Sequence, residues 1–209
     1  MTDRDHRPLG RPPATTGEET RHRLLHAARE CFAEYGFAAT TNRMVADRAG
    51  LTTGAIYHYF PSKQEMYLAA YEGVQEFVYG RFADVVIRED SLLDELRALF
   101  GESARLNAAD HTLSGFLMTR RTDGHLHPEL LAVDQPRHSV RFFEAMAQRA
   151  VGRHELRAVD VEAFVEAMRV LITGMVFVSG ENEAHMKVAI EAVLRLFDGS
   201  LVAHSAQRA

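Results

Sequence analysis

The chain has 209 residues, of which 46% are hydrophobic and 25% are charged, and its formal net charge at pH 7 is −5. This composition is typical of a globular chain with a sizeable core and excludes disorder over most of the length, while a single cysteine, Cys31, excludes a disulfide framework and a zinc site made of cysteines. The longest strongly apolar run, residues 170–178, is too short to span a bilayer, and the polar N-terminus lacks the apolar segment of a signal peptide, so we expect a cytoplasmic protein with no membrane partner.

The N-terminal residues predict an arm followed by a helix. Residues 1–15 contain three of the six prolines and three arginines with almost nothing to bury, which is typical of a disordered basic arm. Thr16 and Glu19 have the spacing of a capping box, and apolar residues then recur every 3.6 positions as far as Tyr35. We expect a helix here that ends at Gly36.

Two short helices are expected next, over residues 41–49 and 52–59. A threonine stands at the start of each as a candidate N-cap, and Gly50 separates them. Two helices of this length joined through a glycine are typical of a helix-turn-helix. The second helix carries hydroxyls, an imidazole and bare backbone, which suit hydrogen bonds to phosphates and base edges better than they suit packing. Small residues at Gly54 and Ala55 let its N-terminus approach a phosphate.

Lys63 is one of two lysines in the chain and lies in the first turn of the following helix. A cation at this position opposes the helix macrodipole, which a phosphate partner explains; the alternative is a solvated surface residue. Residues 1–63 carry nine basic against seven acidic side chains, whereas residues 64–209 carry fifteen against twenty-two. This asymmetry indicates that the N-terminal part meets an anionic partner.

The rest of the chain also has helical periodicity. Ser62 and Glu65 form a second capping box, which predicts a long helix to about Val86. No segment alternates with period two for long enough to predict a strand, so we expect an all-α fold. Further helices are expected over residues 91–109, 112–121, 128–151 with an interruption near Pro136, 160–178 and 182–204.

The stretch 20–70 resembles the DNA-binding domain of the TetR family of repressors. The likeness lies in the Phe-x-x-x-Gly end of the first helix (32–36) and in the segment Gly-x-Ile-Tyr-x-Tyr-Phe-x-x-Lys (54–63). It implies a three-helix helix-turn-helix DNA-binding domain over 16–63 and a helical ligand-binding and dimerisation domain over 64–209, as in the tetracycline repressor. It also implies a repressor that binds a palindromic double-stranded DNA operator as a homodimer and is released by a small-molecule inducer; activation in place of repression stays open.

The resemblance assigns DNA contacts residue by residue. The start of the first helix of the motif meets the DNA backbone or base edges, the N-terminal half of the second lies in the major groove, and its C-terminal half contacts phosphates or thymine methyl groups. Thr53 stands where relatives often have lysine or a larger polar residue, and a hydroxyl reads bases ambiguously, so the operator sequence does not follow. The predicted DNA-binding residues are Thr41, Arg43, Thr52, Thr53, Gly54, Ala55, Tyr57, His58, Tyr59 and Lys63.

The last two helices are predicted to form the dimer interface. Apolar residues surround nearly the whole helix between 163 and 178, so this helix must be buried on two sides, one of them against a partner. The alternative is a monomer whose own core buries both helices. The predicted interface residues are Phe164, Met168, Leu171, Met175, Ile190, Val193, Leu194 and Phe197.

An apolar pocket for the inducer is predicted in the same domain, because methionine suits cavities that accept varied ligands. For most single residues, plain core is the alternative. Residues 111–141 carry four arginines and four histidines against three acids, so an anionic end of the ligand is expected there, a solvated surface being the alternative. The predicted pocket residues are His111, Phe116, Met118, Arg120, Arg141, Phe142, Met146, Met168 and Met175.

Two other functions fit the sequence less well. One is a metal enzyme, because His22, His26 and Glu30 share a helical face, but they lie on its polar side and no His-Glu-x-x-His pattern accompanies them. No nucleophile elbow or Walker loop is present either, so we expect no enzyme, no catalytic residue, no metal and no cofactor. The other is a helical ligand-binding or protein-interaction module without specific DNA binding, against which the intact Tyr57 and Lys63 argue.

Overall fold

The computed structural model describes residues 17–131, 138–178 and 183–201, and every regular element in these ranges is a helix, as predicted. The predicted arm, residues 1–15, lies outside them. None of the described helices is both long enough and apolar enough to cross a membrane. The α-helices are α1 (Gly17–Ala39), α2 (Asn42–Ala49), α3 (Thr53–Tyr59), α4 (Lys63–Val86), α5 (Leu92–Ala109), α6 (His111–Leu126), α7 (His138–Gly152), α8 (Val161–Val178) and α9 (Glu183–Phe197), with short 3-10 helices η1 (Pro128–Leu130) and η2 (Ala158–Asp160).

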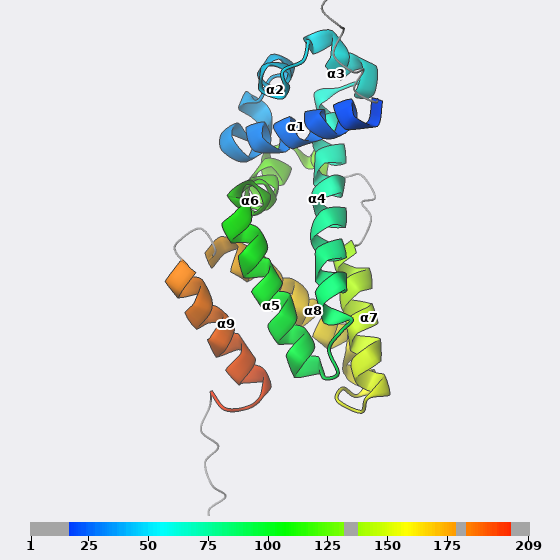
Figure 1. Ribbon diagram of the computed structural model, residues 1–209, viewed down its shortest axis with the longest axis vertical. Helices are drawn as coiled ribbons and strands as arrows, with labels where there is room; N and C mark the ends of the chain where they lie inside the picture. Colours follow the sequence, from blue (N-terminus) through cyan, green and yellow to red (C-terminus); the bar gives the residue numbers. More distant parts are fainter. Residues whose placement is uncertain (1–16, 132–137, 179–182, 202–209) are drawn as a thin grey trace, which may run out of the picture.

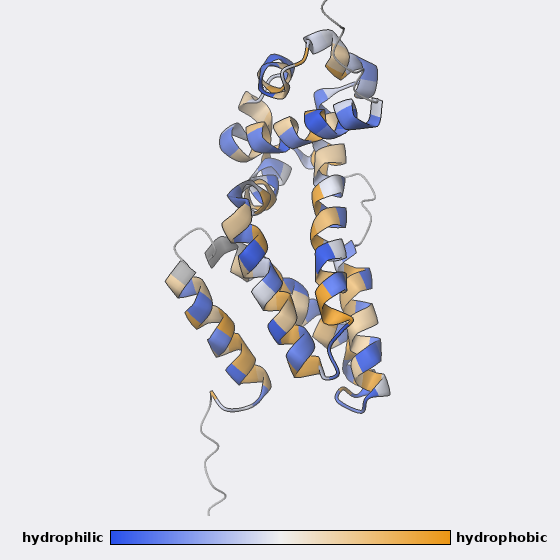
Figure 2. Ribbon diagram, in the orientation of Figure 1, coloured by the Kyte–Doolittle hydropathy of each residue, from blue (hydrophilic) through white to orange (hydrophobic). Residues whose placement is uncertain are grey.

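The helices form two parts joined by α4 (Figure 1). α1 lies across one end of the molecule with α2 and α3 beyond it, and α6 packs against the other side of α1. α4 starts at this end and runs along the molecule beside α7, while α5, α8 and α9 complete the far part. Hydrophobic and hydrophilic residues alternate around α5 and α9 (Figure 2), as expected for helices with one buried face.

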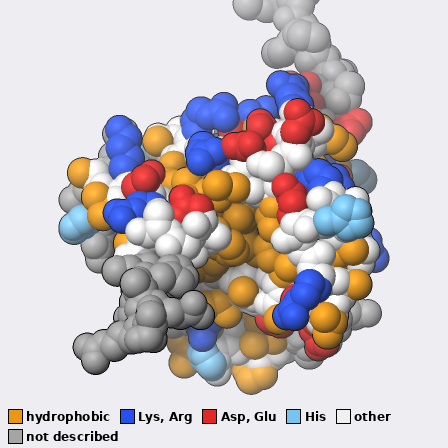
Figure 3. Space-filling view, turned by 90° about the horizontal axis from the view of Figure 1, so that it is seen from below, with side chains coloured by type: hydrophobic (Ala, Val, Ile, Leu, Met, Phe, Trp, Pro, Cys, Tyr) orange, Lys and Arg blue, Asp and Glu red, His pale blue; other side chains and the backbone are white. Residues whose placement is uncertain are grey.

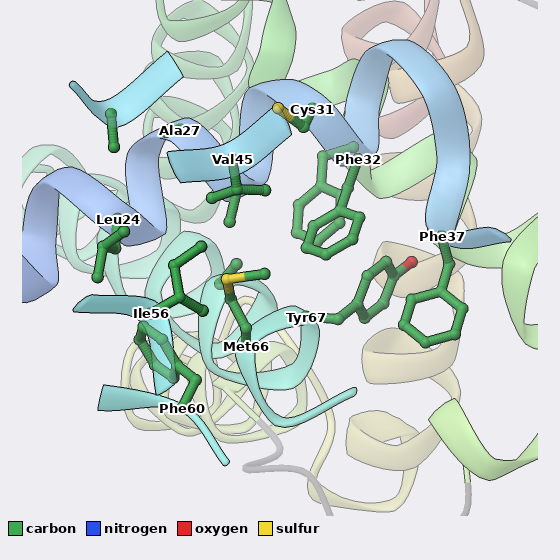
Figure 4. Close-up of a cluster of buried hydrophobic side chains, with 14 of the residues drawn as sticks. Leu24, Ala27, Cys31, Phe32, Phe37, Val45, Ile56, Phe60, Met66 and Tyr67 are labelled. Carbon is green, nitrogen blue, oxygen red and sulfur yellow. The ribbon is translucent and has the colours of Figure 1, made fainter. Parts of the chain in front are cut away.

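A cluster of aromatic rings joins α1, α4 and α6 in the first core. The ring centroid of Phe32 lies 4.7 Å from that of Tyr67, which in turn lies 5.1 Å from that of Phe116. Figure 4 shows Phe32, Phe37 and Tyr67 together in this core. Cys31 is buried here too, as its apolar helix face predicts, and burial raises the pKa of its thiol. The expected pocket position of Phe116 is therefore corrected: its fully buried ring belongs to the contact between the two parts.

The far half of α4 packs with α5, α7, α8 and α9 in a second core. From the end opposite α3, apolar side chains gather in the middle of the molecule with charged side chains around them (Figure 3). Two carboxylates of α5 are buried in this part. Glu95 accepts hydrogen bonds from Arg149 and Arg153, each at 2.9 Å, and Glu102 accepts one from Arg81 at 3.0 Å. Arginine partners thus compensate the burial of both charges.

Several side chains predicted for the pocket or the dimer interface point into this second core. Phe142, for example, is half-buried, with its ring centroid 5.6 Å from that of Tyr79. A side chain buried against its own chain cannot contact a partner, so a dimer interface on α8 and α9 must use their other sides. The predicted residues that are buried in the second core are Met146, Phe164, Met168, Met175 and Leu194.

α1 continues to Ala39, but a kink at the non-helical Gly36 (φ 73°, ψ 173°) interrupts it where its end was predicted. Three later helices also differ from the predicted ones. α6 extends to Leu126 instead of residue 121, because the polar last part of this helix packs against α1 and α4 through the buried Asp123. The helix expected over 128–151, with an interruption near Pro136, corresponds to the short η1 and to α7, and Pro136 lies outside the described ranges. α9 ends at Phe197, and Gly199 follows with a φ of 75°, whereas the predicted helix continued to residue 204. Polar contacts over long sequence distances explain the extension of α6, which periodicity does not detect.

Candidate DNA-binding site

Local hydrogen bonds define α2 and α3. The hydroxyl of Thr41 accepts from the backbone N–H of Met44 at 3.2 Å, and that of Thr52 accepts from the N–H of Ala55 at 3.3 Å, so each threonine is an N-cap. Gly50 ends α2 with a φ of 63° and a ψ of 39°, a left-handed conformation that favours glycine. The structure confirms the predicted helix-turn-helix.

Buried side chains fix the inner side of this motif. Val45 of α2 and Ile56 of α3 are fully buried in the first core, and Phe60 packs beside them after the end of α3. Arg23 of α1 donates to the carbonyl oxygen of Ala49 at 2.6 Å and so ties α1 to the end of α2. Arg23 was not predicted as part of the motif, because its partner lies 26 positions away and no local pattern marks the pair.

The outer side of the motif is polar and accessible. Tyr57 is 60% exposed, which leaves both its ring and its hydroxyl available to a partner. The guanidinium of Arg43 lies 3.7 Å from the carboxylate of Asp47 with both side chains largely exposed, a contact that an incoming phosphate can replace. Of the predicted DNA-binding residues, the exposed ones are Thr41, Arg43, Thr52, Gly54, Tyr57 and His58, and the half-buried ones are Thr53, Ala55, Tyr59 and Lys63.

The ammonium group of Lys63 forms hydrogen bonds within the protein. It donates to the carbonyl oxygens of Phe37, Ala38 and Thr40 at 2.7, 3.3 and 3.0 Å, which uses all three donors of the group. Burial lowers the pKa of Lys63, and the carboxylate of Asp123 opposes this effect. The predicted phosphate contact is therefore corrected: Lys63 caps the C-terminal end of α1, where the helix dipole favours a cation.

Replacing Lys63 with methionine is expected to lower the free energy of unfolding by about 1–3 kcal/mol, because three carbonyl groups lose a charged donor. Urea denaturation followed by circular dichroism measures this change. Arg43→Met is the matched control and is expected to leave stability nearly unchanged, since Arg43 is exposed. Two results together contradict the capping role and restore the phosphate contact. They are an unchanged free energy of unfolding in Lys63→Met and a decrease of about one unit in the slope of log K for DNA binding against log salt concentration.

Two further arginines flank the motif. The guanidinium carbon of Arg21 lies 5.6 Å from the ring centroid of Phe60, and Arg48 donates to the carboxylate of Glu34 at 2.8 Å. This hydrogen bond to Glu34 raises the pKa of Arg48. The excess of basic residues in the N-terminal part of the chain was the only sequence signal for them.

The histidines of α1 do not form a metal site with their neighbours. His26 lies 3.6 Å from Glu30, a pair with i,i+4 spacing. Within the described ranges, no group of three side chains of the metal-binding types is placed to hold an ion.

The residues predicted for the ligand pocket do not gather in one cavity. Met118 and Arg120 line a cavity between α4, α6, α7 and α8, whereas Met175 lines a neighbouring cavity. His111 lies in a surface hollow beside α1, and Arg141 is exposed on α7. Helical periodicity marks apolar faces, but it does not show which of them enclose a space.

Comparisons with known proteins place the motif in a family. Residues 24–70, which contain α2 and α3, match the profile of the tetR family of bacterial regulatory proteins. The HTH-type transcriptional repressor KstR2 of Mycobacterium tuberculosis is 38% identical over 91 residues, which cover 44% of this chain and 44% of KstR2. Residues 24–70 thus resemble the DNA-binding domain of the tetR family. The HTH-type transcriptional repressor AcnR of Corynebacterium glutamicum is 34% identical over 87 residues, 41% of this chain and 43% of AcnR, so the matches span less than half the length of these curated relatives.

Solved structures extend the likeness in fold to nearly the whole chain. FadR from Bacillus subtilis, in complex with stearoyl-CoA, superposes with a TM-score of 0.68 at 17% identity over 86% of this chain and 98% of FadR. GusR of Salmonella enterica superposes with a TM-score of 0.68 at 23% identity over 90% of this chain and 98% of GusR. At these identities the likeness shows a common fold for both parts of the molecule.

Proposed function

We propose that this protein is a ligand-responsive transcriptional repressor of the TetR family that binds a palindromic operator as a homodimer. The observation that carries this proposal is the exposed polar side of α3 at one end of the molecule, held there by a fully packed inner side. The named repressors KstR2 and AcnR match 44% and 41% of the chain, and the complex of FadR with stearoyl-CoA supports a small-molecule effector.

Selection from a random double-stranded DNA library with the purified protein at low salt tests DNA recognition. We expect enrichment of a palindromic site with half-sites about one helical turn apart, as a two-fold dimer requires. Binding without enrichment of any sequence contradicts the repressor and supports the alternative, a helical ligand-binding or protein-interaction module.

Tyr57→Phe is expected to weaken operator binding by roughly 1 kcal/mol, because the exposed hydroxyl loses its hydrogen bond to the DNA. Fluorescence anisotropy with the selected operator measures the change in Kd. Tyr35→Phe on α1 is the matched control. Its hydroxyl is hydrogen-bonded to the neighbouring Glu34, so its removal is expected to leave the Kd for the operator unchanged. Equal Kd values for Tyr57→Phe and the unmodified protein remove Tyr57 from the contact surface.

The outer sides of α8 and α9 support a homodimer. Val170 on α8 is 70% exposed and Val188 on α9 is 68% exposed, and Leu196 and Phe197 are exposed on the last turns of α9. The inner side of α8 packs in the second core, so this outer side carries the apolar surface that the sequence analysis expected a partner to cover. The proposed interface thus keeps α8, α9 and the predicted Phe197 but replaces the buried residues of the sequence prediction with Val170, Val188 and Leu196.

Val170→Glu is expected to raise the Kd of the dimer by about 100-fold, because an isologous interface places two unpaired carboxylates in apolar surroundings. Analytical ultracentrifugation measures the association. Val159→Glu is the matched control, because Val159 is 79% exposed but lies on η2, before the first residue of α8. Dimers of unchanged affinity in Val170→Glu place the interface elsewhere.

α4 provides the link between operator and ligand. It begins at Lys63, beside the helix-turn-helix, and its far half lines the cavities of the second part through Tyr79. A ligand that favours one position of α4 relative to α1 shifts the spacing of the two α3 helices in the dimer. By thermodynamic linkage, operator binding then weakens ligand binding by the same factor.

A further inference from the structure

A cavity of about 460 Å³ between α4, α6, α7 and α8 carries an unusual charge distribution. Three arginines line it: Arg120 and Arg121 from α6 and Arg169 from α8. Among the described residues that line it, none carries a carboxylate. Its volume is within the range of small-molecule sites in proteins, which is roughly 300–1,000 Å³. The cavity is thus large enough for a ligand and positively charged.

The three guanidinium groups differ in how they are held. Arg120 is fixed, because its guanidinium stacks 3.7 Å from the ring centroid of Tyr71 and donates to the carbonyl oxygen of Leu130 at 3.4 Å. Arg169 donates to both carboxylate oxygens of Glu166, at 2.7 and 2.9 Å, on the outside of α8. Arg121 is exposed and forms no ion pair with the described part of the chain. One positioned cation and two adjustable ones therefore surround the space.

A smaller, mainly apolar cavity of about 60 Å³ adjoins the arginine-lined one. The two share the side chains of Gln75, Tyr79, Leu117 and Ile172, which form the wall between them. The smaller cavity has roughly four times the room that one water molecule needs, so it accommodates an apolar group of about four non-hydrogen atoms. A single ligand that extends past these shared side chains contacts arginines at one end and lies in an apolar space at the other.

Tyr79 keeps the wall uncharged. Burial is the largest of the effects that raise the pKa of its hydroxyl, so this group stays protonated at physiological pH. It is hydrogen-bonded to Ser139 at the edge of the larger cavity. Glu166 balances Arg169, and no ion pair with the described residues balances Arg120 or Arg121, so an occupant or solvent supplies the negative charge for these two.

We propose that the regulatory ligand is an amphipathic organic anion whose carboxylate or phosphate is bound by Arg121 and Arg169 beside Arg120. Its apolar group lies along the shared wall and enters the smaller cavity. This inference rests on the proposed regulatory function and specifies the chemistry of its ligand.

The arginines decide between classes of ligand. A ligand that fills the cavity removes water from the guanidinium groups, so it must supply acceptors in place of that water. The planar guanidinium matches the two oxygens of a carboxylate or phosphate, and such charge-assisted hydrogen bonds are about twice as strong as neutral ones. A neutral apolar ligand leaves these donors unsatisfied, and a cationic ligand is repelled by them.

Calorimetric titrations of the full chain with four six-carbon probes test the proposal. Hexanoate and hexyl phosphate are expected to bind at least about tenfold more tightly than hexanol and hexylamine at equal ionic strength. Whichever of the two anions binds more tightly identifies the head group as carboxylate or phosphate. Binding of hexanol or hexylamine as tight as that of the anions, or no binding of either anion, overturns the proposal.

Two sets of variants locate the bound anion. Arg121→Gln and Arg169→Gln are each expected to lower the affinity for the preferred anion about tenfold, through loss of a charge-assisted hydrogen bond. Arg97→Gln is the matched control, because Arg97 pairs with Asp94 on α5 in the same i,i+3 arrangement as Arg169 with Glu166, but lines neither cavity. Equal losses in all three variants overturn the assignment of the site.

Ser103, which lines only the smaller of the two cavities, tests the apolar end. In the unmodified protein hexanoate is expected to bind more tightly than acetate, and Ser103→Leu is expected to remove this difference by filling the space. Tighter binding of hexanoate than of acetate by a Ser103→Leu protein with an unchanged melting temperature overturns the placement of the apolar group. Operator binding is measured with the same preparations. Loss of anion binding with operator binding retained overturns the ligand proposal alone. Loss of operator binding with anion binding retained overturns the repressor proposal alone.

Discussion

Phe116→Ala is expected to lower the free energy of unfolding by about 3–5 kcal/mol, one of the largest effects of any single substitution in this protein. The ring is fully buried, and its centroid lies 6.1 Å from that of Phe32 and 5.1 Å from that of Tyr67. Removing it leaves a cavity among rings from three helices, which cannot close without moving α1 or α4. The cost therefore includes the lost burial and the lost contacts around the cavity.

Urea denaturation of the Phe116→Ala variant measures this effect. Phe77→Ala is the control, because Phe77 is a phenylalanine of α4 that is exposed, and its removal is expected to change stability by much less. A loss of less than about 1 kcal/mol in Phe116→Ala contradicts the core position of the ring and restores its predicted place in a ligand pocket.

The position of Phe116 also gives a second physical connection between the helix-turn-helix and the rest of the molecule. Its neighbours Phe32 and Tyr67 belong to the part that carries the helix-turn-helix, whereas α6 also supplies Arg120 and Arg121 to the arginine-lined cavity. A ligand that shifts α6 therefore shifts a helix packed directly against α1. We therefore expect α6 and α4 together, and not α4 alone, to connect the proposed ligand cavity to α3.

The helix-turn-helix was predictable from the sequence because its determinants are local. Thr41 and Thr52 cap backbone groups three residues away, and Gly50 adopts the left-handed conformation that ends α2. Such signals need no knowledge of the rest of the chain. The start of α4 at its cap Ser62 follows in the same way, since Ser62 accepts from the N–H of Glu65.

The roles of other residues depend on partners that are distant in sequence. Lys63 appears as a solvent-facing cation in its own helix, and only the packed fold brings it to three carbonyls more than twenty residues earlier. The apolar periodicity of α8 likewise shows that two sides are apolar, but not that Met168 faces the chain itself and Val170 faces outward. Arg169 was missed for the same reason, because nothing local places it opposite Arg120 and Arg121.

Asp123→Ala is expected to lower the free energy of unfolding by about 2–4 kcal/mol, because two buried donors lose their acceptor at once. The carboxylate of Asp123, on α6, accepts from the backbone N–H of Phe37 at 3.0 Å and from the hydroxyl of Tyr67 at 3.1 Å. These hydrogen bonds join α6 to the end of α1 and to α4. Asp123→Asn is expected to cost less, since an amide oxygen still accepts hydrogen bonds in this position.

A double-mutant cycle with Tyr67→Phe isolates the contribution of the hydroxyl contact. In the unmodified protein, Tyr67→Phe is expected to cost about 1 kcal/mol, the value of one buried hydrogen bond. In the Asp123→Ala background the same change is expected to cost nothing or to stabilise, because the buried hydroxyl then has no acceptor to lose. Denaturation of the four proteins in urea gives the coupling energy. Additive costs contradict a direct interaction of Asp123 with Tyr67 and leave the aromatic cluster as the physical link between α6 and α4.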